Sequence, residues 1–272
     1  MQEYVRFLFS CAPEEMEILS AALFSLDCAG ITETALGAYE AFFAHEELTI
    51  AAVREFLHER AVRYTAEPVE NRDWNAEWKK SFAPFYFTIE TVVRPGWTPN
   101  TLSCKREIII EPKMTFGTGT HESTQICGAL LERHAHGARS LLDIGTGTGI
   151  LPILAHKLGM RDITAFDTDP LSADNAPENF QLNHCADIKL FIGDIDALRA
   201  GFFADLVSIN IIFSVTAPLL PLLKTMATQG IIFSGILAEE RETFVALLEK
   251  QGMKLKEEIT LHEWFGGIAV HA

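Results

Sequence analysis

The stretch L-L-D-I-G-T-G-T-G at residues 141–149 decides the fold of this chain. Apolar residues run directly into three glycines at alternate positions, which is typical of a buried parallel strand that ends in a tight turn. Because glycine has no Cβ atom, a ligand can approach the backbone of such a turn closely. A second apolar segment, residues 162–166, ends on Asp167, where a carboxylate can accept hydrogen bonds from both hydroxyls of a ribose. Together these features predict that the chain binds an adenosine-containing molecule.

The spacing of these glycines favours one class of adenosine-containing cofactor. Dinucleotide-binding turns have the pattern G-x-G-x-x-G, and the helix that follows points its N-terminus at a pyrophosphate. Here the pattern is the shorter D-x-G-x-G-x-G, which begins with Asp143. It matches methyltransferases that use S-adenosylmethionine, a cofactor without a pyrophosphate. Two alternatives stay open. A nicotinamide-dependent oxidoreductase would need a later third glycine and a hydride-chemistry pair such as Tyr and Lys, and a non-catalytic module would keep only the fold.

The second half of the chain predicts a mostly parallel α/β sheet. From residue 121 on, strands and helices alternate, as in a parallel sheet that helices cover on both faces. The last two strands, residues 254–261 and 264–270, follow each other after a short turn and predict an antiparallel hairpin. A sheet that ends in such a hairpin is typical of Rossmann-like methyltransferases, so we expect their seven-stranded sheet. The other strands are expected at 140–144, 163–166, 188–191, 206–209 and 231–234, with helices near 150–158, 171–183, 214–227 and 238–251.

The first part of the chain predicts a small separate α+β domain. Its strands are expected at 4–10, 31–36, 38–43 and 62–69, and its helices at 13–26 and 46–59. This β-α-β-β-α-β order is that of the ferredoxin-like sandwich. The domain carries about half of the chain's net charge of −15 and no visible catalytic residues. We therefore expect a substrate-recognition domain at 1–69, a linker helix at 70–81 and a methyltransferase domain at 82–272.

Composition and charge restrict the partners and the compartment. A net charge of −15 on 272 residues argues against contact with a nucleic acid backbone and fits a basic protein partner better. The five scattered cysteines include no C-x-x-C pair, which predicts reduced thiols in the cytoplasm and no metal site. The start of the chain lacks a signal-peptide pattern. Residues 206–223 are nearly long enough to span a membrane, but Asn210, Pro218 and Pro221 interrupt them, which favours a strand, a loop and a helix. We expect a monomer.

A second glycine-containing stretch, residues 116–124, is expected to bind the same ligand. Gly117 and Gly119 allow a tight loop whose hydroxyl and backbone N–H groups can bind a carboxylate. Ser123 or Thr124 lies in the first turn of the helix predicted to follow, where unpaired amides and the helix dipole favour an anion. The alternative is a glycine loop with helix-capping residues and no ligand.

Asn210 is the candidate residue expected to lie near the methyl group that is transferred. It follows a predicted parallel strand, and ligands of open parallel sheets bind at the carboxyl ends of strands. Its side-chain carbonyl can accept a hydrogen bond from an attacking amine, although an Asx turn is an alternative. The sequence defines no general base; His121 is the nearest candidate, and ordering of the loop is its alternative role. Phe116, Phe213 and Trp264 can surround a methylated ammonium by cation–π attraction or pack in a core.

These motifs, in this order and spacing, resemble the PrmA family, which methylates large-subunit ribosomal protein eleven. The resemblance covers nearly the whole chain, and it rests on F-G-T-G-T-H-x-x-T, L-D-I-G-x-G-x-G-I-L, D-x-D-P, N-I-I and S-G-I-L-A-E. It implies S-adenosylmethionine as cofactor, recognition of the ribosomal protein by the N-terminal domain, and lysine side chains and an N-terminal amine as acceptors. The cofactor-binding residues are then Thr124, Gly145, Gly147, Asp167 and Asn210, together with Phe116, Thr118 and Gly119 of the first motif.

Two departures from the family pattern stand out. The family commonly has D-P-G ahead of F-G-T-G-T-H, whereas this chain has E-P-K-M-T at residues 111–115. The acid and the proline are kept, but a glycine is lost, which affects the loop and access to the site. The usual N-I-L is N-I-I at residues 210–212, which keeps an apolar side chain. A methyltransferase of a small molecule or of RNA remains the alternative function.

Overall fold

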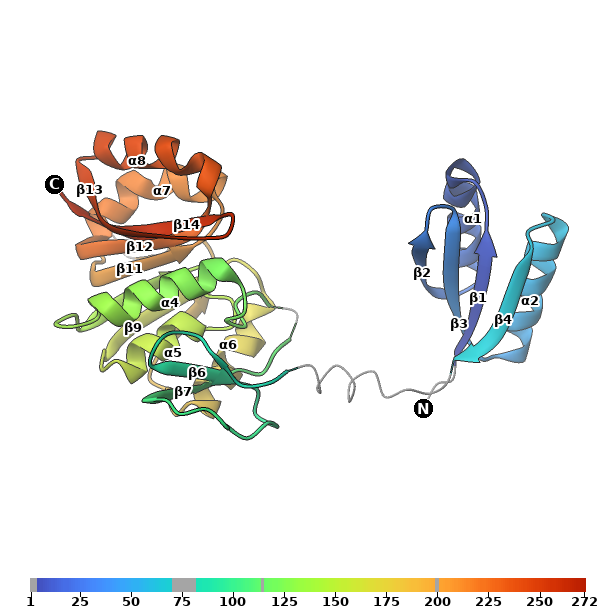
Figure 1. Ribbon diagram of the computed structural model, residues 1–272, viewed down its shortest axis with the longest axis horizontal. Coiled ribbons are helices and arrows are strands. Elements are labelled where there is room, and N and C mark those ends of the chain that lie inside the picture. The colour runs from blue at the N-terminus through green and yellow to red at the C-terminus, as the bar shows by residue number, and fades with distance from the viewer. Residues whose placement is uncertain (1–3, 70–81, 114, 199–200) are drawn as a thin grey trace. The chain divides into compact units, whose positions relative to one another are not determined.

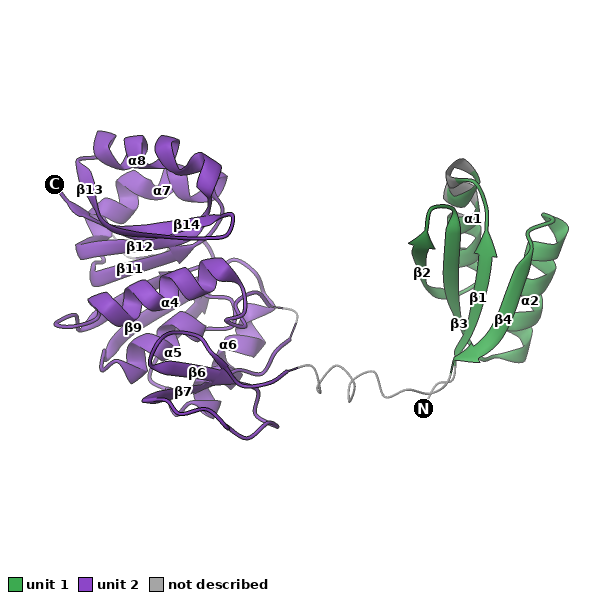
Figure 2. Cartoon of the chain, in the orientation of Figure 1, with its two compact units in different colours: residues 1–81 green, residues 82–272 purple. Residues whose placement is uncertain are grey.

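A computed structural model describes residues 4–69, 82–113, 115–198 and 201–272. The chain divides into two compact units, residues 1–81 and 82–272 (Figures 1 and 2). The linker helix predicted at 70–81 lies outside the described residues. Each unit has its own core, and we describe each by itself.

The first unit is a four-stranded antiparallel sheet with two helices packed on one face (Figure 1). The strand order is β2-β3-β1-β4. Val5, Phe7 and Phe9 of β1 are buried against the helices, because successive side chains of a strand point to opposite faces. The predicted order of elements is confirmed, although β2 begins earlier than expected, at Cys28. The bounds are β1 Tyr4–Ser10, α1 Pro13–Ser25, β2 Cys28–Ala35, β3 Ala38–Ala44, α2 Glu47–Glu59 and β4 Tyr64–Val69.

The second unit is built on a seven-stranded sheet of order β10-β9-β8-β11-β12-β14-β13. Strand β14 pairs antiparallel with both β13 and β12, and the other neighbours are parallel. The predicted α/β fold with a large, mostly parallel sheet and a C-terminal hairpin is therefore confirmed. The bounds are β8 Ser140–Ile144, β9 Asp162–Asp167, β10 Lys189–Ile192, β11 Ala204–Asn210, β12 Ala227–Leu237, β13 Met253–Leu261 and β14 Trp264–His271.

Helices cover both faces of this sheet. Three of them share one buried apolar cluster with the strands: α4 Glu122–His134, α5 Ile150–Lys157 and α6 Ser172–Leu182. A second cluster joins the opposite face to α7 Phe213–Met226 and α8 Arg241–Lys250. Residues 206–223 form strand, loop and helix, as predicted. Across the described ranges, no helix is both long and apolar enough to cross a membrane.

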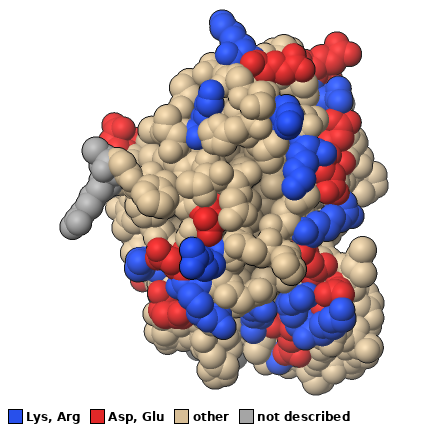
Figure 3. All heavy atoms as spheres, turned by 90° about the vertical axis from the view of Figure 1, so that its left-hand side faces the viewer, with Lys and Arg blue, Asp and Glu red and all other residues tan. Residues whose placement is uncertain are grey.

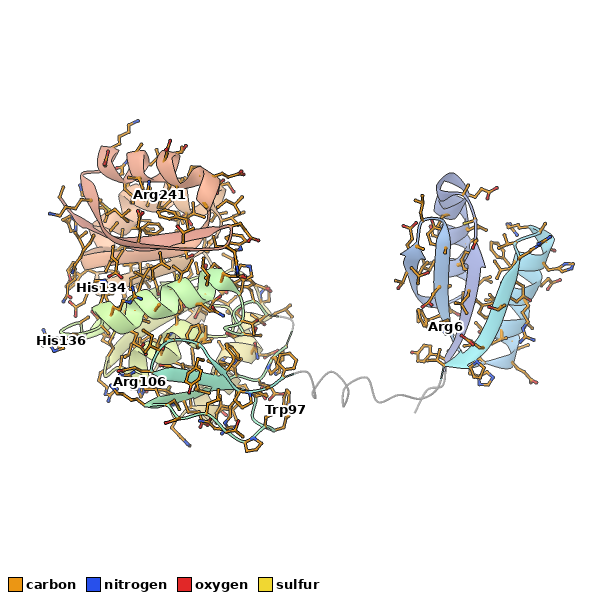
Figure 4. The ribbon with its side chains drawn as sticks, in the orientation of Figure 1. Arg6, Trp97, Arg106, His134, His136 and Arg241 are labelled. Atoms are coloured by element: carbon orange, nitrogen blue, oxygen red, sulfur yellow. The ribbon has the colours of Figure 1, made fainter. Side chains whose placement is uncertain are left out.

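A small three-stranded sheet precedes the large one, in a region where the sequence predicted only strands and loops. It consists of β5 Phe85–Tyr86, β6 Thr91–Arg94 and β7 Arg106–Ile109. The carboxylate of Glu132 on α4 accepts hydrogen bonds from the hydroxyls of Thr88 (2.7 Å) and Thr91 (2.9 Å) and from the guanidinium of Arg106 (3.2 Å; Figure 4). These bonds tie the small sheet to the helix that carries Thr124.

Candidate functional site

The glycine turn after β8 is tightly packed on its inner side. Gly145 and Gly147 both have positive φ, 71° and 54°, a conformation that side chains with a Cβ atom avoid. A Cβ atom at Gly147 would lie 2.2 Å from the backbone oxygen of Phe116, and one at Gly145 would lie 2.7 Å from the side chain of Ile211. Glycine is therefore required at Gly147 by packing as well as by conformation, whereas at Gly145 the positive φ is the main constraint because the end of the Ile211 side chain can shift.

Asp167 lies at the carboxyl end of β9, beside this turn. Its Oδ2 accepts a hydrogen bond from the backbone N–H of Gly147 at 2.8 Å, and its Oδ1 accepts one from the N–H of Asp169 at 3.0 Å. Each carboxylate oxygen can accept more than one hydrogen bond, so the half-buried carboxylate keeps acceptor capacity for hydroxyls. The structure thus brings together the two features of the predicted adenosine site.

Asp143, the acid that precedes the glycines, lies beneath the turn and is fully buried. Burial raises its pKa to about 6, and a hydrogen bond from the hydroxyl of Ser208 on β11 acts in the opposite direction. Asp143 and Ser208 are direct neighbours in the parallel pair β8–β11. Asp143 therefore supports the turn from below and joins two central strands.

The loop at residues 116–121 packs directly on the glycine turn. The N–H of Thr148 donates to the oxygen of Phe116 at 3.0 Å, and the hydroxyl of Thr148 donates to the oxygen of Gly117. Thr118 faces its neighbour Thr120, with 3.1 Å between the two hydroxyl oxygens. A Cβ atom at Gly119 would lie 2.8 Å from the side chain of Ile150, so this glycine serves packing. The two glycine stretches therefore form one continuous surface.

His121 begins helix α4. Its Nδ1 accepts hydrogen bonds from the backbone N–H of Ser123 at 3.2 Å and lies 2.8 Å from the hydroxyl of the same residue. A backbone N–H can only donate, so Nδ1 carries no proton and the neutral ring carries its proton on Nε2. The basic lone pair is thus engaged in capping the helix, which supports the ordering role for His121 over that of a general base.

Asn210 and Thr124 meet at the carboxyl edge of the sheet. Asn210 ends β11, and its Nδ2 donates to the hydroxyl oxygen of Thr124 in the first turn of α4 at 3.2 Å. The amide is placed with its nitrogen toward Thr124. The other end, Oδ1, is buried and has no hydrogen-bond partner within the described part of the chain. A buried acceptor without a partner is costly, so it marks a position where a ligand donor fits.

Three aromatic rings meet at the start of α4, and one predicted ring does not join them. The His121 ring lies edge-on between those of Phe116 (5.2 Å between centroids) and Trp264 (4.9 Å). Phe213 instead packs against Phe244 in the core between α7 and α8, at 5.9 Å. The predicted grouping of Phe116, Phe213 and Trp264 is therefore wrong with respect to Phe213, because the first turn of α7 directs that ring into the core.

Three asparagines, two on α6 and one directly after it, also hold the site, and sequence reasoning missed them. Asn179 accepts from the N–H of Glu111 at 2.8 Å, Asn175 donates to the oxygen of Glu111 at 3.1 Å, and Asn183 forms bonds in both directions with the backbone of Ile109. They lie one helical turn apart and face the segment that departs from the family pattern. The spacing N-x-x-x-N-x-x-x-N in a predicted helix is the signal that identifies them.

The residues present fit S-adenosylmethionine. The backbone of Gly147 is held between Phe116 and Asp167 in a turn without room for a Cβ atom, Asp167 supplies a carboxylate for hydroxyls, and the unpartnered Oδ1 of Asn210 lies at the same edge of the sheet. A mostly parallel sheet with a C-terminal antiparallel hairpin carries all of them at the carboxyl ends of its strands. Fold and site together define the class of S-adenosylmethionine-dependent methyltransferases.

Comparison with known proteins identifies the family. The family model for ribosomal protein L11 methyltransferase (PrmA) matches residues 3–271, and the chain belongs to this family. The ribosomal protein L11 methyltransferase of Pediococcus pentosaceus is 36% identical over 214 residues, which cover 76% of this chain and 67% of that protein. The corresponding protein of Acetivibrio thermocellus is 34% identical over 200 residues, which cover 72% of this chain and 63% of that protein. The chain thus matches about two thirds of the length of these relatives.

A solved structure shares the fold. It is the ribosomal protein L11 methylase of Lactobacillus delbrueckii subsp. bulgaricus, with 26% sequence identity and a TM-score of 0.64. The alignment covers 69% of this chain and 98% of that one. The sequence-based resemblance to the PrmA family is therefore confirmed.

Proposed function

We propose that this chain transfers methyl groups from S-adenosylmethionine to lysine side chains and the N-terminal amine of ribosomal protein L11. Membership of the PrmA family supports the substrate. The observation that carries the chemistry is the unpartnered Oδ1 of Asn210, held in place through Nδ2 by Thr124. An acceptor so placed can bind the N–H of a neutral amine and direct its lone pair.

The chain contributes alignment and exclusion of water. When bound, the cofactor supplies a methyl group on a positively charged sulfur. Because the leaving group is then a neutral thioether, the protein needs no acid to protonate it. Alignment of the two reactants can lower a barrier by roughly 7–11 kcal/mol. A free lysine has a pKa of about 10.4, so presenting it as a neutral amine at pH 7 costs about 4 kcal/mol. Burial of the amine beside apolar side chains reduces this cost, and the proton passes to water before the amine is enclosed.

Several residues are assigned to the cofactor within this proposal. Asp167 binds the ribose hydroxyls, and Gly145 and Gly147 allow the cofactor to approach the backbone. The hydrogen bond from the N–H of Gly147 to Asp167 supports this assignment. Thr124 and Asn210 face the reacting end. Phe116, Thr118 and Gly119 form the loop that lines the other side, supported by the bond between Phe116 and the glycine turn.

The first unit is the substrate-recognition domain in this proposal. Its element order and the strand order β2-β3-β1-β4 support a ferredoxin-like classification of residues 1–69, and its acidity suits a basic ribosomal protein. On the face of the second unit shown in Figure 3, Lys and Arg are interspersed with Asp and Glu, which speaks against binding of nucleic acid there. Five free cysteines and a ribosomal substrate support a cytoplasmic enzyme, and the expected monomeric state stays a prediction.

The test is methyl transfer to purified L11. The full chain is incubated with radiolabelled S-adenosylmethionine and unmodified L11, and the label is located by mass spectrometry. We expect label on amine nitrogens of L11 and none with Asp167→Ala. Asp162→Ala is the matched control, because this exposed acid lies at the opposite end of the same strand. Cofactor binding without labelled protein would favour a small-molecule or RNA methyltransferase, and absence of cofactor binding would remove the activity.

A further inference from the structure

Phe116 lies in the loop assigned to the cofactor site, and its ring is nevertheless exposed. Its side chain is 55% exposed, which is costly for a phenylalanine. Yet its backbone is fixed by the bond to Thr148, and its ring rests edge-on against His121, which in turn rests against Trp264. These three rings, here called the aromatic wall, come from separate segments and meet at one place.

The aromatic wall lies at the same edge of the sheet as the acceptor of the amine. The oxygen of His121 accepts a hydrogen bond from the N–H of Thr124, and Thr124 holds Asn210. On the other side, Trp264 pairs with Leu237 at the end of β12, the strand next to β11. His121 of the wall thus lies within one helical turn of Thr124, the residue that holds Asn210.

The wall is held from both sides and bears no positive charge on His121. The imidazole of His262, in the turn between β13 and β14, bonds the carboxylate of Glu122 on α4 at 3.0 Å, which ties the hairpin that carries Trp264 to α4. The Nδ1 of His121 accepts from a backbone N–H, so this ring is neutral while it caps the helix. A neutral aromatic surface beside a carboxylate suits a cation.

We propose that the aromatic wall of Phe116, His121 and Trp264 binds the partly methylated ammonium of the acceptor, so that the same nitrogen is methylated again. This inference rests on the proposed function. Each methyl group replaces an N–H that the Oδ1 of Asn210 could bind, so hydrogen bonding weakens from one round to the next. Cation–π attraction needs no N–H, so the wall holds methylated forms that Asn210 alone would release.

Each round is balanced in the same way. The lone pair of the neutral nitrogen forms the new N–C bond while the C–S bond of the donor breaks, and its electron pair stays on sulfur. The nitrogen, now positively charged, releases a proton to water if it still carries one, and fresh cofactor replaces the spent one. The last round produces a quaternary ammonium without N–H, for which the wall is the natural partner.

The test compares the first and the last methyl transfer. Unmodified L11 reports the first transfer, and L11 dimethylated on its amines with formaldehyde and a hydride reagent reports the last. For Trp264→Leu, we expect the rate of the last transfer relative to the first to fall by roughly 3- to 30-fold compared with the wild type. Trp264→Phe is the matched control, because it keeps an aromatic face. Its rate of the last transfer relative to the first should stay close to that of the wild type. Phe116→Leu and Phe116→Tyr form a second pair.

A binding measurement separates this inference from the proposed function. Tetramethylammonium is titrated into the full chain without cofactor, and binding is followed by NMR. The wild type should bind it, and Trp264→Leu should bind it several-fold more weakly. Equal slowing of first and last transfer, or equal binding of tetramethylammonium by both proteins, would overturn the role of the wall. A wild type that binds tetramethylammonium but methylates no L11 would overturn the proposed substrate and leave the wall as an ammonium site.

Discussion

Replacing Gly147 by alanine tests whether the close packing of the glycine turn against Phe116 supports cofactor binding. The new Cβ atom would lie 2.2 Å from the backbone oxygen of Phe116, whereas ordinary contacts begin near 3.4 Å. The two segments must therefore separate by about 1 Å, which breaks the bond between Thr148 and Phe116 and displaces the N–H that Asp167 accepts. Positive φ costs alanine about 1–2 kcal/mol, and each lost hydrogen bond costs about 1 kcal/mol. We expect a loss of about 3 kcal/mol in the free energy of unfolding.

Cofactor affinity should fall with the distortion. If a third to two thirds of this energy is expressed in binding, the Kd for S-adenosylmethionine rises roughly 5- to 30-fold. Titration calorimetry measures the Kd, and urea unfolding measures stability. Gly137→Ala is the matched control, because Gly137 also has positive φ, 85°, but a Cβ atom there meets nothing within 4 Å. If Gly147→Ala binds the cofactor as tightly as Gly137→Ala does, the packing of the glycine turn does not determine cofactor affinity, and the reasoning is refuted.

Three further predictions concern buried polar groups. Burial raises the pKa of Asp143 from 3.8 to about 6, so the folded protein binds this proton more tightly than the unfolded chain does. The contribution of Asp143 to the free energy of unfolding is greatest below pH 4 and falls by roughly 3 kcal/mol as the pH rises to 6. In Asp143→Asn, urea unfolding between pH 4 and 8 should no longer show this fall. Asn210→Ala should slow methyl transfer on the order of 100-fold with a smaller change in cofactor Kd by calorimetry, and equal losses in both would contradict the orienting role. Asn179→Ala leaves the backbone N–H of Glu111 and the buried backbone oxygen of Thr148 without their Asn179 partner and should cost about 2–4 kcal/mol in urea unfolding, whereas the exposed Gln181→Ala on the same helix should cost less than about 0.5 kcal/mol.

Local patterns were sufficient to predict much of this protein. The apolar run and glycines at residues 141–149 define a strand and a turn because the conformation of each is set by neighbouring residues. Alternation of strands and helices implies a parallel sheet, and the carboxyl ends of its strands place Asp167 and Asn210 at one edge without knowledge of side-chain contacts. The final hairpin followed from two strands separated by a short turn.

Tertiary structure decided which of these residues act together. The bond between Asn210 and Thr124, the support of Asp143 by Ser208 and the meeting of Phe116, His121 and Trp264 each join segments far apart in the chain. No period of 2 or 3.6 residues encodes such pairs, because they depend on strand register and on how α4 packs across the sheet. For the same reason Phe213 was wrongly grouped with the other rings. The sequence by itself determined the kind of cofactor site, and the packing of distant segments determined that the Oδ1 of Asn210 is left without a partner in the described part of the chain.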